Sequence, residues 1–364
     1  LCLGLIDREG VDSIHGYDLG RQHSVQDRLR TLDQADAKER QATNTRSLRK
    51  LAAGSVLGIT LYRYYLSLQR PYKLPGSRDV VYHFPNFHLP RVSGPSVVTV
   101  HDMTHRLYPD YHPRARVSWL NQMLPRAVRQ SDHIICVSES TRTDLLREFD
   151  FADSKTSVIY PGVSDVFRRQ SSQQTQATLS QFGLSHGSYF LVVSTMEPRK
   201  NIEALLDAYL ALPGELRDAY PLVLAGVMGW MCEGIKARLE ALQGSQVIYL
   251  GYVSEQQLPV LYSGALCFVY PSFYEGFGLP LLEAQASGVP LITSNTSSLP
   301  EVAGPDAMLV NPRDIDELSG RLRKAAEDSE WRARCAASGL AYARQFSWQR
   351  CVGETLEVYR SLLR

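Results

Sequence analysis

The stretch Leu266–Ser294, "LCFVYPSFYEGFGLPLLEAQASGVPLITS", decides the fold. An apolar run comes first, then a turn with Gly276 and Gly278, then a helical segment opened by Pro280, and then a second apolar run. Short apolar runs of this kind are typical of buried parallel strands, and proline suits the first turn of a helix. The stretch therefore predicts a strand–helix–strand unit of an α/β protein.

The same alternation runs through most of the chain in two series. The first series begins at Val80, with the strand-like runs "VVYHF", "SVVTVHD", "HIICVS" and "TSVIYPGV" and helical segments over 117–130 and 139–149. The second begins at Tyr189, with "YFLVVST", "PLVLAG", "VIYLGYV", "LCFVYPS", "VPLITS" and "AMLVNP". Such alternation predicts two doubly wound, Rossmann-like parallel sheets that bind ligands at the carboxyl ends of their strands.

Helices are predicted between the strands of the second series, over residues 201–212, 232–243, 254–264, 280–287 and 314–328. Asn201 and Ser254 stand where N-caps are expected. The polar segment 168–181, "RRQSSQQTQATLSQ", has the composition of a linker. The closing segment 330–364 reads as helical, with a break near Phe346.

Composition limits the class of protein. The chain has 364 residues, of which 44% are hydrophobic and 21% charged, and its net charge is +1. These values are typical of a globular protein, and no strong field points to nucleic acid as a partner. Six scattered cysteines without a CxxC pair favour a reducing, cytoplasmic compartment. No apolar run is long enough to predict a transmembrane helix.

The N-terminal part of the chain is basic and rich in tyrosine. Residues 21–70 read as mainly helical, and Arg46–Lys73 mixes apolar, tyrosine and basic residues. One interpretation is a helix packed on a core with a solvated basic face. The other is a surface that lies against anionic lipid. Both can hold at once.

The glycine turn within the opening stretch has the features of an anion site. Gly276 and Gly278 let backbone approach a ligand closely, and the helix opened by Pro280 offers unpaired N–H groups. Glu275 precedes the turn, and Glu283 lies about one helical turn beyond it. Carboxylates accept hydrogen bonds from hydroxyl groups, so a diphosphate with a sugar at each end matches best. A strand–turn–helix with surface glutamates is the alternative.

Two further segments carry charge or a histidine at a strand's carboxyl end. Arg199 and Lys200 follow "YFLVVST" and precede a helix, where two cations can neutralise a diphosphate leaving group. His101 and Asp102 end a strand of the first series, facing the crevice expected between two domains. The alternatives are a solvated basic turn and a structural histidine.

Taken in order, these segments resemble the retaining glycosyltransferases of family 4, in the mannosyltransferase-like branch of bacterial polysaccharide synthesis. The resemblance covers roughly Val80–Arg364. It is carried by "HFPNFHLP", "VVTVHDMTHRLYPDYHP", "DHIICVSESTRTDL", "VIYPGV", "VSTMEPRKN", "LAGVMGW", "LGYVS", "PSFYEGFGLPLLEAQASGVPLITSNTSSLPEVAG" and "NPRD". The Glu-x7-Glu spacing of Glu275 and Glu283 is one of these shared features.

The resemblance implies a role for each matching residue. Glu275 would bond donor-sugar hydroxyls, Glu283 the ribose, and His101 the sugar near its anomeric carbon. Arg199 and Lys200 would hold the diphosphate. The remaining implied contacts with the nucleotide sugar are Gly226, Tyr252, Val253, Ser272, Gly276, Phe277, Gly278, Leu279 and Asn295–Ser298. No bound metal or other cofactor is implied, since no DxD-like motif stands in a matching place.

The resemblance also implies the GT-B architecture, in which two Rossmann-like domains face a central cleft. Residues 1–172 would form the N-terminal acceptor domain and 173–345 the donor domain. Residues 346–364 would form a helix that crosses back to the N-terminal domain. "LCLGLI" (1–6) is similar to the family's second strand, so its first strand and glycine-rich loop are expected to be missing from residues 1–172. Ser194-Thr195 stand where many relatives carry an arginine.

The implied activity is that of a hexosyltransferase that retains the anomeric configuration. Mannose or a deoxyhexose such as rhamnose would pass from a nucleoside diphosphate, with GDP favoured, to a lipid-linked polysaccharide such as O-antigen. The basic, tyrosine-rich N-terminal part indicates a lipid-linked acceptor at the cytoplasmic face of the inner membrane. Two other functions stay open: a nucleotide-sugar epimerase of the same fold, and a non-catalytic partner subunit.

Overall fold

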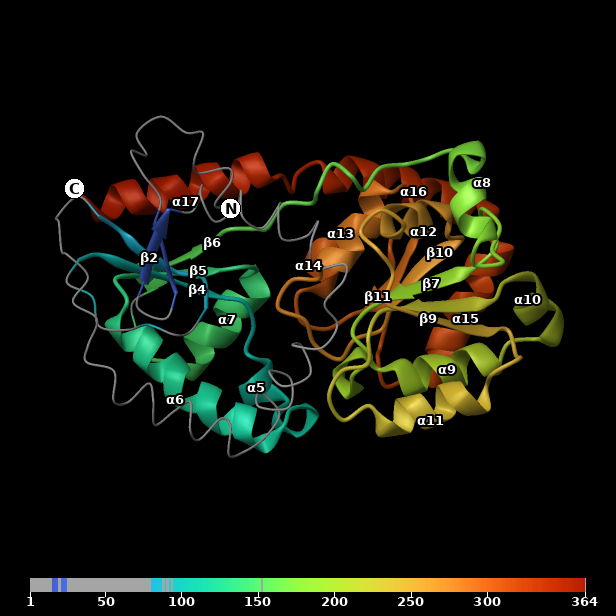
Figure 1. Cartoon of the computed structure of the whole chain (residues 1–364), viewed down its shortest axis with the longest axis horizontal. Helices are drawn as coiled ribbons and strands as arrows, with labels where there is room; N and C mark the ends of the chain where they lie inside the picture. The colour runs from blue at the N-terminus through green and yellow to red at the C-terminus, as the bar shows by residue number, and fades with distance from the viewer. Residues whose placement is uncertain are drawn as a thin grey trace. The chain divides into compact units, whose positions relative to one another are not determined.

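The computed structural model describes residues 15–18, 21–24, 80–86, 89, 92, 94–151 and 153–363 (Figure 1). The chain divides into two compact units. One comprises residues 1–98, 122–133 and 352–364, and the other 99–121 and 134–351. The boundaries predicted at residues 172 and 345 stay a prediction.

A four-stranded sheet carries the first series of strands. Its strands are β3 (Tyr82–Phe84), β4 (Ser96–Val100), β5 (His133–Cys136) and β6 (Thr156–Val158), in that spatial order. The β3–β4 and β5–β6 pairs are parallel. The helices that follow β4 and β5 are α5 (Thr104–Leu107), α6 (Arg114–Gln130) and α7 (Glu139–Glu148). All five residues of β4 are buried, as expected of a strand in a parallel sheet.

A six-stranded parallel sheet lies within the second unit. Its strands are β7 (Phe190–Val193), β8 (Leu222–Ala225), β9 (Val247–Gly251), β10 (Cys267–Tyr270), β11 (Leu291–Ser294) and β12 (Met308–Val310). Their order is β12-β11-β10-β7-β8-β9, which is the Rossmann order read from its far edge. The direction of winding reverses between β7 and β10. The loops after these two strands are therefore where a doubly wound fold binds its ligand.

Helices cover both faces of this sheet because side chains of each strand alternate between two cores. In β7, Phe190 and Val192 belong to one core and Leu191 to the other. The first core is completed by α9 (Ile202–Leu210), α11 (Glu233–Ala241) and α15 (Ile315–Glu327), and the second by α12 (Leu258–Gly264), α13 (Leu279–Ala286) and α14 (Leu299–Ala303) (Figure 1).

The remaining helices are α8 (Ser172–Ser180), α10 (Gly214–Ala219), α16 (Ser329–Ala343) and α17 (Trp348–Leu362), with 3-10 turns η2 (Pro109–Tyr111), η3 (Asp153–Lys155) and η4 (Pro198–Lys200). The two-series strand–helix alternation is confirmed, and so is the predicted break near Phe346, which lies between α16 and α17. Ser254 does not cap α12. Its hydroxyl accepts from the N–H of Gln257 at 3.3 Å, within a turn that precedes the helix.

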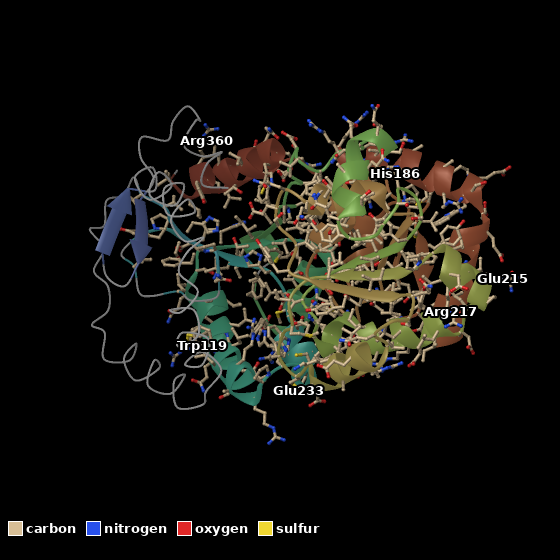
Figure 2. All side chains as sticks on the ribbon, turned by 45° about the vertical axis from the view of Figure 1, so that its right-hand side comes forward. Trp119, His186, Glu215, Arg217, Glu233 and Arg360 are labelled. Carbon is tan, nitrogen blue, oxygen red and sulfur yellow. The ribbon has the colours of Figure 1, made fainter. Side chains whose placement is uncertain are left out.

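The predicted linker at 168–181 is wrong over most of its length, because Ser172–Ser180 form α8. Ser171 and Gln174 make a capping box at the start of this helix. Thr175 and Leu179 are buried, and the Thr175 hydroxyl lies 2.9 Å from the Nδ1 of His186, which Figure 2 marks. The polar composition of residues 168–181 therefore did not indicate the short helix, because only a narrow face of it is buried.

The helix predicted over residues 21–70 is wrong at its start. Arg21–Ser24 form β2, which pairs in antiparallel fashion with β1 (His15–Asp18). Within this pair Asp18 is opposite Arg21. The predictions for residues 1–6 and 25–73, including contact with lipid, fall outside the described residues. No helix of the described part is long and apolar enough to cross a membrane.

Candidate active site

A buried ion pair between Lys200 and Glu275 lies at the switch point of the six-stranded sheet. Lys200 ends η4, in the loop after β7, and Glu275 lies in the turn after β10. The lysine Nζ is 2.6 Å from Oε1 of Glu275, and Nη1 of Arg199 is 2.7 Å from Oε2. The structure thus brings together three of the predicted site residues, and both oxygens of the carboxylate face a cation.

Two residues that the sequence did not predict complete this cluster. Oε1 of Glu197 lies 2.6 Å from Nη2 of Arg199, and the side chain of Glu197 is 2% exposed. The hydroxyl of Tyr270 accepts a hydrogen bond of 2.7 Å from Lys200. Two carboxylates therefore balance two cations. Neither residue could be recognised in the sequence as part of the site. A Glu two positions before an Arg in a loop, as for Glu197, is an ordinary spacing.

Burial and neighbouring charges together set the pKa values of the residues in this cluster. Burial raises the pKa of Glu275, but the neighbouring Lys200 and Arg199 outweigh it and lower that pKa to about 2. Burial lowers the pKa of Lys200 and of Arg199, but the neighbouring anionic groups together outweigh it and raise both pKa values. Glu275 contributes most in both cases, and Glu197 adds to the effect on Arg199. Glu275 is therefore ionised, and the two cations are protonated, at neutral pH.

The turn at Gly276 is held against residues that follow strands of the other sheet. A Cβ added at Gly276 would lie 1.7 Å from the carbonyl oxygen of His101, so no side chain fits there. The carbonyl of Gly276 accepts from the hydroxyls of Ser138 and Thr141, at 2.6 and 3.0 Å, at the start of α7. The structure thus brings the backbone of His101 to the glycine turn, while its side chain is exposed. Its contact with the donor sugar stays a prediction.

The serines of the predicted segment Asn295–Ser298 fix the same turn from its other side. The N–H of Glu275 donates to the hydroxyl of Ser297 at 2.9 Å. The hydroxyl of Ser298 lies 2.9 Å from the carbonyl of Glu275 and 2.8 Å from that of Phe277. Through these bonds the serines hold the backbone of the turn in place.

The N-terminus of α13 follows the turn directly. Gly278 is its N-cap with φ of 108°, a conformation that residues with a Cβ rarely adopt. Among the described residues no side chain caps this end, and Pro280 lies in the first turn. Leu279 is half-exposed, while Phe277 is buried against Tyr160. Pro280 has no N–H, and the N–H of Leu281 donates to the carbonyl of Gly278 at 2.9 Å. The N–H of Leu279 and the positive end of the helix dipole are therefore what this end of α13 can offer to an anion.

Three other predicted residues lie in closely packed surroundings. Glu283 accepts a 2.7 Å hydrogen bond from the hydroxyl of Tyr262, and burial raises its pKa. Gly226 has φ of 137°, and a Cβ there would lie 1.8 Å from the carbonyl oxygen of Ser194. Ser272 is fully buried, and its hydroxyl has no hydrogen-bond partner among the described residues.

Tyr252 and Val253 follow β9. Tyr252 is 73% exposed, so its ring is open to a ligand, whereas Val253 is half-buried. Among the described residues, no hydrogen bond, ion pair or ring contact joins either of them to the Lys200–Glu275 pair. Their role stays a prediction.

An aromatic cluster that the sequence did not predict lies beside the loop after β10. The rings of Tyr111 and Phe273 stack with centroids 5.4 Å apart. The indole N–H of Trp230 donates to the carbonyl of Tyr111 at 2.7 Å, and the ring of His112 lies 5.6 Å from the indole. Through these contacts the segment after β4 packs against the loops after β8 and β10.

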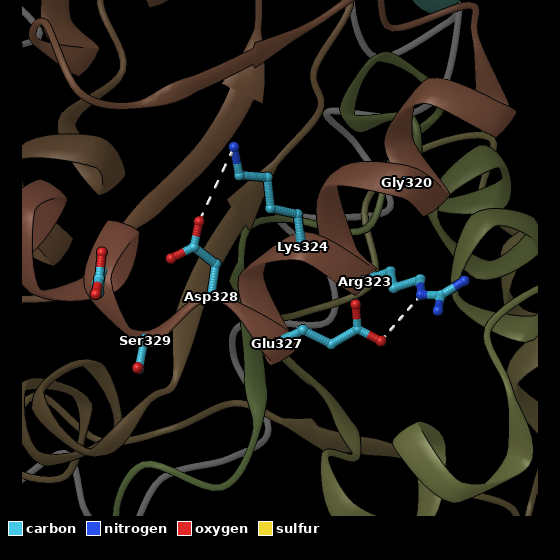
Figure 3. A pocket seen from close by; sticks show the side chains of 7 residues that line it. Gly320, Arg323, Lys324, Glu327, Asp328 and Ser329 are labelled. Carbon is cyan, nitrogen blue, oxygen red and sulfur yellow. Dashed lines mark hydrogen bonds and ion pairs between the residues drawn. The ribbon is translucent and has the colours of Figure 1, made fainter.

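A surface hollow at the junction of α15 and α16 is not a second candidate site (Figure 3). Four of the charged side chains that line it pair with one another, Arg323 with Glu327 at 3.0 Å and Lys324 with Asp328 at 4.0 Å, and the fifth, Glu330, pairs with Arg334 at 4.0 Å. None of the predicted site residues lines it.

The described part of the chain holds no group of three or more His, Cys, Asp or Glu side chains arranged to bind a metal ion. Independence of metal stays a prediction.

Two families match separate parts of the sequence. The family described as "Glycosyltransferase Family 4" matches residues 45–166, and the one described as "Glycosyl transferases group 1" matches residues 181–341. The second match contains the loops after β7 and β10, and hence Lys200 and Glu275.

Curated relatives extend these matches. The O-antigen chain mannosyltransferase B of Escherichia coli is 38% identical over 305 residues, which cover 84% of this chain and 80% of that protein. The serotype-specific mannosyltransferase WbdA of Escherichia coli is 33% identical over 256 residues, which cover 69% of this chain but only 31% of that longer protein.

Solved structures share the fold. HepE of Anabaena, crystallised with UDP and glucose, superposes with a TM-score of 0.63 at 21% identity over 74% of this chain and 72% of that one. WaaG, a glycosyltransferase involved in lipopolysaccharide biosynthesis, superposes with a TM-score of 0.59 at 16% identity, over 75% and 77% of the two chains. Both neighbours are GT-B glycosyltransferases. The chain thus has the GT-B fold and belongs to glycosyltransferase family 4, in its mannosyltransferase-like branch.

Proposed function

We propose that this protein transfers mannose from GDP-mannose to a growing, lipid-linked O-antigen glycan. The observation that carries the proposal is the buried Lys200–Glu275 pair at the switch point between β7 and β10. A glycosyltransferase of this fold binds its donor at such a point. The choice of mannose and of O-antigen follows the names of the two Escherichia coli relatives, and GDP is the nucleotide favoured by the sequence resemblance.

In the proposed donor site, positive groups bind the diphosphate and carboxylates accept hydrogen bonds from the hydroxyls of the sugars on either side of it. The uncapped N-terminus of α13 and the ammonium of Lys200 would hold the phosphates. The carboxylate of Glu275 has two oxygens, and each has lone pairs beyond those that face Lys200 and Arg199, so it can still accept hydrogen bonds from sugar hydroxyls. Glu283 would accept a hydrogen bond from a ribose hydroxyl, and this bond would replace the one that it now accepts from Tyr262.

The proposed chemical step retains the anomeric configuration. The acceptor oxygen would attack the anomeric carbon from the face of the leaving phosphate, and the bond from that carbon to the phosphate oxygen would break. The acceptor's proton would pass to the departing phosphate oxygen. The helix terminus and Lys200 would stabilise the charge that develops there. His101, whose backbone lies against Gly276, would contact the sugar near the reacting carbon.

Two variants of the pair test this site. Lys200→Ala and Glu275→Ala should each lower kcat/KM for GDP-mannose by about 100-fold or more, since each removes a buried charge at the donor. Asp207→Asn is a matched control, because Asp207 pairs with Arg238 at 2.5 Å on the surface between α9 and α11. It should leave turnover unchanged. Turnover at the wild-type rate in both site variants would refute the assignment.

The choice of nucleotide is tested separately by calorimetric titration of the wild-type protein with GDP and with UDP. Tighter binding of GDP is expected. Binding of UDP alone would refute the proposed donor while leaving the site itself intact.

A further inference from the structure

Glu197 is a buried carboxylate to which the proposed donor site gives no role. We infer that Glu197 is a positioning residue: it holds Arg199 so that this arginine fixes Glu275, and it cancels the charge of Arg199 so that the nucleotide product can leave. The inference rests on the proposed donor site.

The geometry around Arg199 is that of a fixed clamp. Nη2 lies 2.6 Å from Oε1 of Glu197, while Nη1 lies 2.7 Å from Oε2 of Glu275 and donates to the carbonyl of Tyr274 at 2.6 Å. A guanidinium is planar and rigid, so a carboxylate on one edge sets the direction of the other edge. Glu197 therefore orients Glu275 through Arg199.

The loop that carries these residues is anchored without Glu197. Asn201 has φ of 58°, and its amide donates to the carbonyls of Pro271 and Pro312, at 3.1 and 2.6 Å. The N–H of Phe273 donates to the carbonyl of Arg199 at 3.0 Å. A change of Glu197 to the isosteric amide should therefore alter charge and side-chain orientation and leave the path of the backbone unchanged.

The balance of charge predicts an unusual kinetic effect. Glu197 and Glu275 together cancel Lys200 and Arg199, so the cluster is neutral before the donor arrives. Without the charge of Glu197 the cluster gains one net positive charge in a buried place, where attraction for a diphosphate is strong. The nucleotide product should bind more tightly, while a less firmly oriented Glu275 should lower turnover.

The experiment compares Glu197→Gln with the double variant Glu197→Gln/Arg199→Gln. For each, kcat and KM are measured with GDP-mannose, and the Kd of free GDP is measured by calorimetry. Glu197→Gln should lower kcat about tenfold and tighten GDP binding by about threefold or more, by the arithmetic of one added buried charge. The double variant restores neutrality, so its Kd for GDP should return to within about twofold of the wild-type value while kcat stays low.

Two outcomes for Glu197→Gln would overturn the inference about Glu197. Weaker GDP binding by Glu197→Gln, together with a lower kcat, would show a merely structural residue and overturn the inference. Wild-type kcat and Kd in Glu197→Gln would overturn it as well. The surface control Asp207→Asn should change neither quantity. If the wild-type protein binds no nucleotide and transfers no sugar, the proposed function fails together with the inference, whereas the first two outcomes leave that function intact.

Discussion

At Gly276 two backbones meet in a space that admits no side chain. The carbonyl of His101 occupies the position of a Cβ, and the hydroxyls of Ser138 and Thr141 hold the glycine's own carbonyl. A glycine here serves a close approach of main chain, since its φ is not in the left-handed region. The position of Glu275, one residue earlier, therefore depends on packing that begins in another sheet.

Gly276→Ala should remove most activity and destabilise the fold. A Cβ at 1.7 Å from a carbonyl oxygen forces the backbone apart, at a cost of about 3 kcal/mol in the free energy of unfolding. Urea denaturation and turnover with GDP-mannose measure the two effects.

Gly320→Ala is the matched control. Gly320 lies inside α15, and nothing lies within 4 Å of its added Cβ. Alanine should stabilise this helix by about 0.5 to 1 kcal/mol. Equal stability losses in the two variants would contradict the close packing assigned to Gly276.

At the scale of single residues the sequence predicted the charged groups and missed their partners. Glu275, Lys200 and Arg199 were predictable because charged side chains and glycines follow apolar strands at a sheet edge. Ser138 was not, because its bond with Gly276 joins residues 138 positions apart. The Lys200–Glu275 contact itself spans 75 positions, and it became visible only once the strand order placed β7 beside β10.

At the scale of elements, apolar runs predicted the strands and most helices of both sheets. Their spatial order was not predictable, because periodicity tells which residues are buried and not which strands are neighbours. Helix α8 was missed because its sequence is rich in Gln, Ser and Thr, and only Thr175 and Leu179 are buried. The signal that could have found it is the spacing of Ser171 and Gln174, which is that of a capping box.

Ser171→Ala should lower the stability of the second unit by about 1 kcal/mol, since it removes the hydroxyl that accepts from the N–H of Gln174. Ser172→Ala, at the first, exposed position of the helix, should change stability by less than about 0.5 kcal/mol. Thermal unfolding followed by circular dichroism compares the two. A larger loss in Ser172→Ala would show that the box does not stabilise α8.

At the scale of the whole molecule, two buried histidines make stability depend on pH. The pKa of His105 and of His112 is lowered to about 4, chiefly by burial; nearby Arg116 acts in the same direction and Asp102 opposes it. The folded protein thus keeps both rings neutral where the unfolded chain, with pKa near 6.5, binds protons. Their contribution is complete above pH 6.5 and is lost as the pH falls from 6.5 towards 4.

The free energy of unfolding should therefore fall by up to about 2 kcal/mol per histidine between pH 6.5 and pH 5. In His112→Gln the free energy of unfolding should depend less steeply on pH, because glutamine does not titrate and the contribution of one histidine is lost. Urea denaturation at pH 7.5, 6.5, 5.5 and 5.0 gives the slope. An unchanged slope in the variant would show that His112 takes up its proton equally in the folded and the unfolded state.

In the proposed reaction this GT-B protein moves mannose with retention from a GDP donor held at the Lys200–Glu275 pair. The most direct test is incubation of the wild-type protein with GDP-mannose, with and without a mannose-terminated glycan acceptor, followed by NMR of the anomeric centre. Because the donor is α-linked, we predict a new α-mannoside that forms only with acceptor and is absent with Glu275→Ala. A β-linked product, or epimerised nucleotide sugar formed without acceptor, would contradict the account.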